Sequence, residues 1–426
     1  MKHLLLILCL TFGVQKATSQ TYFPPLVGSQ WDTMAPQSLG WCEDSITQLY
    51  DWLETSNSKA FIVLKNGKIV LEKYFGTFTV DSFHVWNSAG KTLTAYAVGI
   101  AQHEGFLDIN EPTSNYLGTA WTSCTPTQEL AITIRNQLTM TSGLDDVTDF
   151  YCTDPACLTY VADAGTRWAY HNGPYTLLDS VIESATGTNL NTWVYQKIGS
   201  KIGMNGLFVQ NGYNNVFVSK PRAMARFGLL LSQNGFWNGT EVLNDPNYLN
   251  EMRTPSQNLN NAYGYLTWLN GQSSFMLPQS QFVFNGSICP NAPADMYAAL
   301  GKNGQIINVV PSSGIVLIRM GEDMGNSLVG SQYNDTLWQY MNRLSCNLSL
   351  NENLDELEIY PNPVESYFLL EGLKAEDHVH ITDLNGKELT FNTSGNRIDC
   401  SYWAPGIYLV HINRNGTSVT KRIAIN

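Results

Sequence analysis

Ser88 and Lys91 are the two residues of this 426-residue chain whose types and spacing most directly suggest chemistry. They form an S-x-x-K pattern, and the apolar residues after it repeat with the period of an amphipathic helix that ends near Gly105. Ser88 is therefore expected to open a buried helix, with Lys91 one turn further on the same face. Because burial disfavours an ammonium group, such a lysine loses its proton more easily, and a neutral lysine beside a serine activates it as a nucleophile.

The S-x-x-K pattern is weak evidence by itself, because it also occurs at Ser56/Lys59 and Ser418/Lys421. Ser56 lies in a polar stretch before an expected strand, and Ser418 lies in a strand-like segment near the C-terminus. Of the three serines, only Ser88 is followed by a long helix with an apolar face. The context of the pattern therefore favours Ser88 as the candidate nucleophile.

Two further patterns accompany this pair. Tyr170-His171-Asn172 is a Y-x-N pattern within a helical region, and Lys302-Asn303-Gly304 is a K-x-G pattern at the head of an expected strand. Each is weak alone, since K-N-G recurs at Lys65 and Y-x-N recurs at Tyr213, Tyr248, Tyr340 and Tyr360. Their order along the chain and their structural context connect them with Ser88.

The elements that must position these residues follow from periodicity and turn signals. Residues 41–57, 176–185, 221–231 and 330–344 have helical spacing. Asn66-Gly67 separates two apolar runs and is a strong hairpin signal, while residues 306–310 and 315–318 indicate late strands. We expect an α/β (α+β) domain at residues 20–345, in which early and late strands form one antiparallel sheet flanked by helices, with a large helical insertion between them.

The composition of the chain changes after Cys346. Residues 346–353 are polar and acidic, which indicates a linker. Residues 354–426 contain short alternating strands separated by the turn signals Asn385-Gly386 and Asn415-Gly416. A small C-terminal β-sandwich domain is therefore expected.

Charge and composition narrow the class of protein. The net charge of −12 argues against a nucleic-acid-binding surface. A composition of 43% hydrophobic and only 14% charged residues predicts that most of the chain is folded.

Residues 1–19 have the basic start, apolar stretch and small-residue cleavage site of a signal peptide; the alternative is a buried N-terminal helix. The apolar stretch is too short to span a bilayer, so we expect an exported protein without a transmembrane helix.

Seven of the eight cysteines lie outside the predicted signal peptide, and export makes disulfides possible. Cys152 and Cys157 are close enough to bridge a loop, and Cys42 and Cys346 flank the main folded region and could tie its ends. Cys400 lies alone in the tail. Neither a C-x-x-C nor an H-x-x-x-H spacing occurs, so no metal site is expected.

In combination, these patterns resemble the serine β-lactamase and penicillin-binding-protein superfamily, and most closely its class C β-lactamase-related branch. The resemblance covers roughly residues 40–345 and includes the stretches 136–144, 165–170 and 225–231. That branch contains esterases, D-amino-peptide hydrolases and nylon-oligomer hydrolases. The sequence has no G-x-S-x-G motif, which argues against an α/β-hydrolase triad.

The resemblance implies a role for each residue and no cofactor. Ser88 would attack a carbonyl carbon and form an acyl-enzyme, while Lys91 and Tyr170 would share its proton; which of the two is the base stays open. The substrate would be bound by Asn172 and the K-x-G residues Lys302 and Gly304, with Lys302 also lowering the pKa of Tyr170. By the same analogy, the backbone N–H groups of Ser88 and Gln305 would form the oxyanion hole.

The sequence departs from the family pattern at Asn303. Many penicillin-recognising enzymes have a hydroxyl residue there, which helps to hold a β-lactam carboxylate. Its absence favours ester or amide substrates over β-lactams. The alternative to a hydrolase is a non-catalytic penicillin-binding-like protein on the same fold.

The tail resembles the C-terminal sorting domain of type IX secretion in Bacteroidetes. The stretches that carry this resemblance are residues 360–363, 383–387 and 406–410. It implies the secretion machinery as a partner and a secreted or cell-surface location. The alternative for this domain is a carbohydrate-binding β-module.

Overall fold

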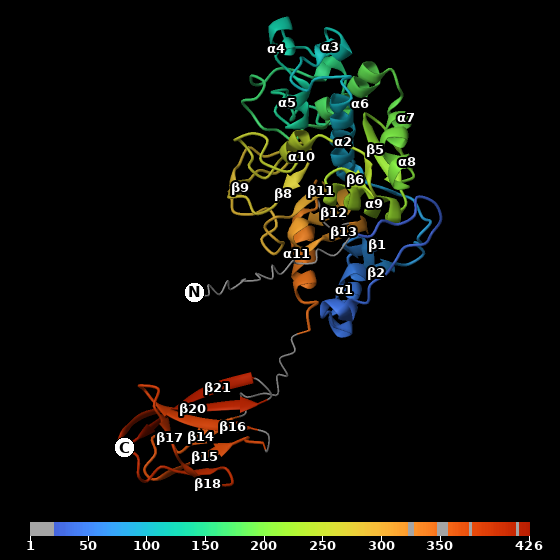
Figure 1. Ribbon diagram of the computed structural model, residues 1–426. Coiled ribbons are helices and arrows are strands. Elements are labelled where there is room, and N and C mark those ends of the chain that lie inside the picture. Colours follow the sequence, from blue (N-terminus) through green and yellow to red (C-terminus); the bar gives the residue numbers. More distant parts are fainter. Residues whose placement is uncertain (1–20, 323–327, 347–356, 375–376, 415–416) are drawn as a thin grey trace, which may run out of the picture. The chain divides into compact units, whose positions relative to one another are not determined.

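The computed structural model describes residues 21–322, 328–346, 357–374, 377–414 and 417–426 (Figure 1). The chain divides into two compact units, residues 1–345 and 346–426, and each has a hydrophobic core of its own. The predicted signal peptide and most of the predicted linker lie outside the described residues.

The first unit is built on a six-stranded antiparallel sheet with the order β2-β1-β13-β12-β11-β8. Its strands are β1 (Ser58–Lys65), β2 (Lys68–Tyr74), β8 (Trp268–Leu269), β11 (Tyr297–Gly301), β12 (Gln305–Val310) and β13 (Ile315–Gly321). β1 and β2 form the predicted hairpin, in which Asn66 and Gly67 have φ angles of 48° and 83°. A two-residue turn between twisted strands requires such positive values.

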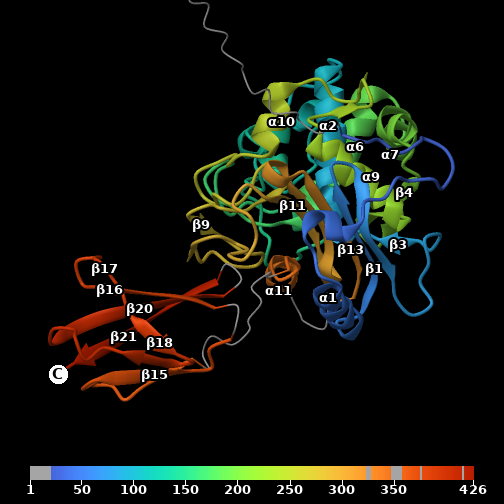
Figure 2. The same cartoon turned by 60° about the horizontal axis from the view of Figure 1, so that its bottom comes forward.

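Helices cover both faces of this sheet (Figure 2). α1 packs on β1 and contacts α11 on one side, while α9 packs on β1, β12 and β13 from the other side, next to α2. The helices of this unit are α1 (Glu43–Thr55), α2 (Gly90–His103), α3 (Ser114–Leu117), α4 (Pro126–Leu130), α5 (Ile134–Leu138), α6 (Asn172–Thr186), α7 (Leu190–Val194), α8 (Ser200–Ile202), α9 (Pro221–Ser232), α10 (Pro246–Met252) and α11 (Ser331–Asn342). The predicted fold class is confirmed: strands from both ends of the unit share one sheet, and α3 to α10 form the insertion.

The first unit also contains short strands that the sequence patterns do not predict. They are β3 (His84–Val85), β4 (Gly206–Asn211), β5 (Asn214–Ser219), β6 (Phe236–Trp237), β7 (Thr240–Glu241), β9 (Ser274–Phe275) and β10 (Phe284–Asn285). β3, β5 and β4 form a three-stranded sheet, and β5 contacts α6. This small sheet becomes one wall of the cavity described below.

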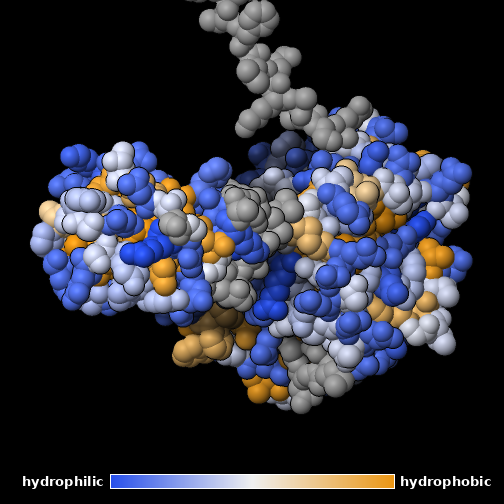
Figure 3. All heavy atoms as spheres, turned by 90° about the horizontal axis from the view of Figure 1, so that it is seen from below, coloured by the Kyte–Doolittle hydropathy of each residue, from blue (hydrophilic) through white to orange (hydrophobic). Residues whose placement is uncertain are grey.

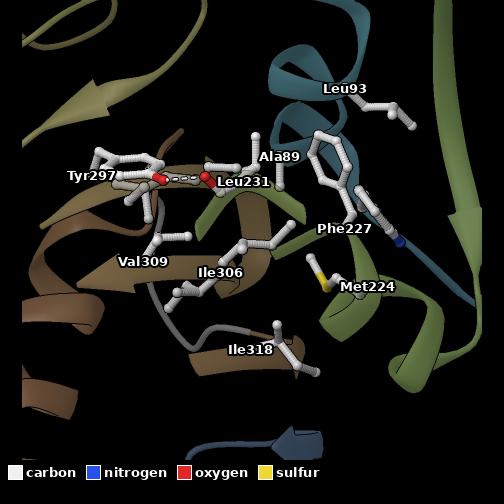
Figure 4. Packing of buried hydrophobic residues seen from close by; sticks show 14 of the residues in the cluster. Ala89, Leu93, Met224, Phe227, Leu231, Tyr297, Ile306, Val309 and Ile318 are labelled. Carbon is white, nitrogen blue, oxygen red and sulfur yellow. Dashed lines mark hydrogen bonds between the residues drawn. The ribbon is translucent and has the colours of Figure 1, made fainter. Parts of the chain in front are cut away.

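The core between α2, α9 and the sheet holds the start of α2 in place (Figure 4). Phe227 of α9 lies near Ala89 and Leu93, and the sheet contributes apolar side chains such as Ile306 and Ile318. Tyr297 of β11 donates a hydrogen bond of 2.7 Å to the carbonyl oxygen of Leu231 in α9. Burying each large apolar side chain of this kind contributes roughly 1.5–3 kcal/mol.

α2 is buried more completely than an amphipathic helix would be. Every residue from Gly90 to Ala101 is buried, because α6, α10 and β11 all pack against this helix. A helix enclosed on all sides lies in the interior of a domain. Lys91, in its first turn, is therefore removed from water.

The second unit is a β-sandwich of two four-stranded sheets, β14-β15-β19-β18 and β17-β16-β20-β21. Its strands are β14 (Glu358–Tyr360), β15 (Tyr367–Glu371), β16 (His378–Asp383), β17 (Glu388–Leu389), β18 (Asn392–Ser394), β19 (Arg397–Asp399), β20 (Gly406–Arg414) and β21 (Thr417–Ile425). Phe368 of one sheet and Val410 of the other are fully buried in the shared core. Asn385-Gly386 connects β16 with β17, while Asn415-Gly416 lies outside the described residues.

The cysteines agree with the predicted pattern where the structure describes them. Cys152 and Cys157 form a disulfide, and Cys42 and Cys346 are both disulfide-bonded. Cys400 is free and buried.

Within the described residues, no helix is long and apolar enough to cross a membrane. On the face seen in Figure 3, hydrophobic residues lie in small groups among hydrophilic ones.

Candidate active site

The short helix η2 (Asn87–Ala89) leads directly into α2 and carries Ser88. Asn87 has a φ angle of 47°, a left-handed conformation that asparagine tolerates better than most residues. Lys91 follows one turn later, and its Nζ atom donates a hydrogen bond of 2.9 Å to Ser88 Oγ. The structure thus places the predicted pair in direct contact.

Lys91 lies among aromatic rings in the interior. Its side chain is 3% exposed, and its Nζ atom lies 4.2 Å from the ring centre of Tyr175 and 5.1 Å from that of Tyr170. Burial lowers the pKa of Lys91 to about 7, and the nearby charge of Asp179 opposes this shift. Near neutral pH a substantial fraction of this lysine is therefore uncharged and able to accept a proton.

Tyr170 and Asn172 reach the same place from the N-terminus of α6. Tyr170 is 2% exposed, and burial raises its pKa while its hydrogen bond with Ser88 lowers it. Its phenol is therefore protonated at neutral pH. Asn172 is also buried, and its Oδ1 atom has no hydrogen-bond partner. An unpaired buried acceptor that lines a cavity is available to a donor on a bound molecule.

The Lys302-Asn303-Gly304 pattern lies in a turn, η5 (Lys302–Gly304), between β11 and β12. Lys302 is exposed at the rim, and Asn87 Nδ2 donates a hydrogen bond of 2.9 Å to its carbonyl oxygen. Burial and the charge of Tyr151 raise the pKa of Tyr170 and its hydrogen bond with Ser88 lowers it, while the predicted effect of Lys302 on this pKa stays a prediction. The motif stands directly before β12, at the head of a strand as the sequence predicts, and its three residues form the connection between Gly301 of β11 and Gln305 of β12.

Gly304 and Gln305 are not among the residues that line the cavity beside Ser88. The Gln305 side chain is fully buried and donates a hydrogen bond to the carbonyl oxygen of Gly321 in β13. Gly304 has a φ angle of 69°, and a Cβ atom there would lie 2.4 Å from Arg319 Nη1. Both residues therefore shape the turn, and their predicted roles at the substrate stay predictions.

Gly301 is the glycine that lies against Ser88, and the sequence patterns do not single it out. A Cβ atom at Gly301 would lie 2.5 Å from the Trp86 carbonyl oxygen and 3.1 Å from the Ser88 nitrogen. Only glycine allows the end of β11 to approach the start of α2 so closely. The signal for it was present in the sequence, since Gly301 ends the apolar run that forms β11.

Ser88 opens into a cavity of about 300 Å³. Asparagine and aromatic side chains make up most of its lining, which consists of Asn87, Ser88, Lys91, Phe150, Tyr151, Tyr170, Asn172, Tyr175, Asn211, Asn214, Asn215, Val216, Lys302, Asn303 and Leu328. Sequence patterns do not identify Phe150, Tyr151 or the β4–β5 asparagines, because these residues reach the cavity through tertiary contacts. Among the residues that the structure describes, this lining contains two lysines and no carboxylate.

Asp179 lies behind this lining, on the face of α6 that also presents Asn172 and Tyr175. Asn215 Nδ2 donates a hydrogen bond of 2.9 Å to Asp179 Oδ2, and Asp179 Oδ1 is buried without a partner. Burial raises the pKa of Asp179 to about 7, and the hydrogen bond from Asn215 opposes the rise. A carboxyl group thus lies within electrostatic range of Lys91, and no motif in the sequence points to it.

One group of metal-ligand types occurs among the described residues, Asp149 with Cys152 and Cys157. The two cysteines are joined in a disulfide and cannot act as thiolate ligands in this state. The site at Ser88 has instead the parts for nucleophilic acyl transfer: a hydroxyl, a proton acceptor in contact with it and a second proton carrier.

Residues 55–327 match the β-lactamase family. The chain belongs to the β-lactamase family. Residues 358–426 match the secretion system C-terminal sorting domain, so the β-sandwich is a sorting domain. Both predicted resemblances are confirmed, and members of the β-lactamase family are usually serine hydrolases.

Individual relatives are distant. An uncharacterised protein of Alkalihalophilus pseudofirmus is 22% identical over 66% of this chain and 88% of its own length. A putative 6-aminohexanoate-dimer hydrolase from Bacillus anthracis is 19% identical, with a TM-score of 0.58 over 74% of this chain and 87% of its own. A family VIII carboxylesterase is 15% identical, with a TM-score of 0.52 over 72% and 99% of the two chains. At these identities, the solved structures show a shared fold and not a shared substrate.

Proposed function

We propose that this β-lactamase-family protein is an exported serine hydrolase that cleaves esters or amides through an acyl-enzyme. The observation that carries the proposal is the 2.9 Å contact between Ser88 Oγ and the buried Lys91 Nζ, at the wall of a 300 Å³ cavity. Structural relatives with the same fold are described as a putative 6-aminohexanoate-dimer hydrolase and a family VIII carboxylesterase.

The pKa shifts of the two candidate bases favour Lys91 as the residue that accepts the proton of Ser88. With a pKa of about 7, Lys91 is partly neutral at physiological pH, whereas burial keeps Tyr170 protonated. Lys91 takes the Ser88 proton as Ser88 Oγ attacks the carbonyl carbon. Tyr170 then gives its phenolic proton to the leaving oxygen or nitrogen and is reprotonated from Lys91, so that no proton is lost. Water attacks the acyl-enzyme by the reverse route and regenerates Ser88.

The negative charge on the attacked carbonyl oxygen needs N–H donors on the other side of Ser88. We assign this role to the backbone N–H groups of Ser88 and Lys302, in place of Ser88 and Gln305. The assignment is supported by the close approach of Gly301 to the Ser88 nitrogen and by the position of Lys302, which follows Gly301 and lines the cavity.

The lining of the cavity favours amide-containing substrates. Asn172 Oδ1 offers an unpaired acceptor to a substrate N–H, and further amide side chains line the β4–β5 wall. Lys302, exposed at the rim, attracts a substrate carboxylate. Short amides, D-amino-peptides and small esters fit this chemistry better than β-lactams, because Asn303 supplies no hydroxyl beside Lys302.

Covalent capture tests the proposal. A fluorophosphonate probe should add one phosphonyl group per chain, and peptide mass analysis should locate it on Ser88. The same protein should hydrolyse members of a panel of esters, short amides, D-peptides and β-lactams. Stoichiometric acylation without turnover on any of them would instead identify a penicillin-binding-like binding protein.

We expect kcat/KM to rise with pH through about 7, because Lys91 must be neutral to accept the serine proton and its pKa is lowered to about 7. Asp179→Asn should move this midpoint to lower pH, since the Asp179 carboxylate stabilises the Lys91 ammonium. The measurement is p-nitrophenyl acetate hydrolysis between pH 5 and 9. Glu104→Gln, at the far end of α2, is the control. An unchanged midpoint in Asp179→Asn would contradict the proposed effect of the Asp179 carboxylate on Lys91.

The sorting domain supports export through type IX secretion and delivery to the cell surface or medium. We propose that residues 354–426 serve export alone, because the cavity and all the residues assigned to catalysis belong to residues 1–345.

A chain of residues 20–350 should therefore fold and hydrolyse p-nitrophenyl acetate with the kcat/KM of the full-length protein. It retains Cys42 and Cys346, which are both disulfide-bonded. Circular dichroism and thermal melting show whether the shortened chain is folded. A folded but inactive shortened chain would make the tail a functional module.

A further inference from the structure

Two walls of the cavity come from segments far apart in the sequence. One wall is the loop that precedes the Cys152–Cys157 disulfide and contributes Phe150 and Tyr151. The other is the β4–β5 hairpin, which contributes Asn211, Asn214, Asn215 and Val216. Neither wall carries Ser88, Lys91 or Tyr170.

Each wall is anchored at its base to α6. In the first wall, the Phe150 carbonyl oxygen accepts a hydrogen bond of 3.2 Å from the Asn172 backbone N–H. In the second wall, the side chain of Asn215 donates a hydrogen bond to the Asp179 carboxyl group. The disulfide loop has a further anchor, because Ser123 Oγ donates a hydrogen bond of 2.6 Å to the Pro155 carbonyl oxygen. These anchors leave the outer ends of the two walls as the parts that can separate.

The outer ends are tied directly to each other. Tyr213, at the tip of the β4–β5 hairpin, donates a hydrogen bond of 2.7 Å from its hydroxyl to Asp154 Oδ2 in the disulfide loop. Tyr213 is 42% exposed and Asp154 is exposed, so this bond lies at the surface, outside the cavity lining. Tyr213 also begins one of the Y-x-N patterns that recur in the sequence. Its hydroxyl connects the two walls of the cavity through this hydrogen bond.

We propose that the Tyr213–Asp154 hydrogen bond acts as a clasp that limits the size of the acyl group that reaches Ser88. The proposal rests on the hydrolase function above. While the clasp is closed, the two walls confine the substrate to the 300 Å³ cavity. When it opens, Tyr151 and the hairpin asparagines move apart and a longer acyl chain is admitted. Tyr213 and Asp154 are thus specificity-determining residues that do not touch the reacting atoms.

The test compares p-nitrophenyl acetate with p-nitrophenyl octanoate. Tyr213→Phe removes only the hydroxyl, and it should raise the octanoate-to-acetate ratio of kcat/KM by about threefold to tenfold, the range expected for one hydrogen bond. Hydrolysis of the acetate should change little, since the catalytic groups are untouched. Asp154→Ala should have the same effect, and the double variant should equal either single variant, because both remove one interaction. Tyr195→Phe, an exposed tyrosine of η4 (Tyr195–Gly199), is the control.

Hydrogen exchange supplies a readout that does not depend on hydrolysis. In Tyr213→Phe, amide exchange should become faster in both walls, residues 145–158 and 206–219, and not elsewhere. An unchanged substrate ratio, additive effects in the double variant, or faster exchange in only one wall would overturn the clasp. If the wild-type protein hydrolyses neither of these esters nor any other member of the substrate panel, the hydrolase proposal fails, while the exchange experiment still decides whether the two walls are coupled.

Discussion

Replacing Ser88 with alanine should reduce ester hydrolysis by about a thousandfold or more, because it removes the atom that forms the acyl-enzyme. The substitution deletes one oxygen and leaves the buried start of α2 intact, so the thermal melting temperature should stay close to that of the wild type. The fluorophosphonate label should disappear at the same time. Both are measured on the full-length protein, by kcat/KM for p-nitrophenyl acetate and by intact mass.

Ser56→Ala is the matched control for this experiment. Ser56 belongs to another S-x-x-K pattern in the same unit, but its hydroxyl contacts Tyr333 and the Leu53 carbonyl oxygen. This variant should keep both activity and label. Wild-type turnover in a folded Ser88→Ala protein would rule out the acyl-enzyme mechanism.

Replacing Tyr170 with phenylalanine should lower kcat by about a hundredfold to ten-thousandfold, the usual contribution of a positioned proton carrier. KM should change much less, because the phenol acts mainly in the transition state and the ring remains packed against Phe150 and Trp268. Steady-state kinetics on esters with good and poor leaving groups would show this. The loss should be largest with the poor leaving group, which depends most on a delivered proton.

Tyr175→Phe separates proton relay from packing. Tyr175 also lines the cavity, and its ring centre lies closer to Lys91 Nζ than that of Tyr170. Among the described residues, its hydroxyl has one hydrogen-bond partner, Thr94 Oγ1 at 3.5 Å. We expect only a small change in kcat for this variant. Equal losses in the two variants, or a Tyr170→Phe protein that loses binding but keeps turnover, would mean that Tyr170 is a pocket residue and not a relay.

The sequence by itself determined the features that depend on local spacing. The three-residue step from Ser88 to Lys91 brings the two side chains together wherever the segment is helical, and the structure places them 2.9 Å apart. Asn66-Gly67 specifies its own hairpin, because few other residue pairs adopt two positive φ angles in succession. The Y-x-N pattern likewise lies at the start of a helix, with Tyr170 and Asn172 both reaching the cavity.

The tertiary structure alone decided which other residues face Ser88. The K-x-G pattern shows a lysine and a glycine before a strand, but it does not show on which side of the turn the chain meets α2. The register of β11 with β12 settles this, bringing Gly301 against Ser88 and leaving Gly304 and Gln305 to shape the turn. Side chains brought in from separate elements, such as Phe150, Asp179 and Asn215, have no spacing relative to Ser88 that a linear pattern could record. Their contacts exist only because burying α2 on all sides draws α6, β5 and β11 around one point.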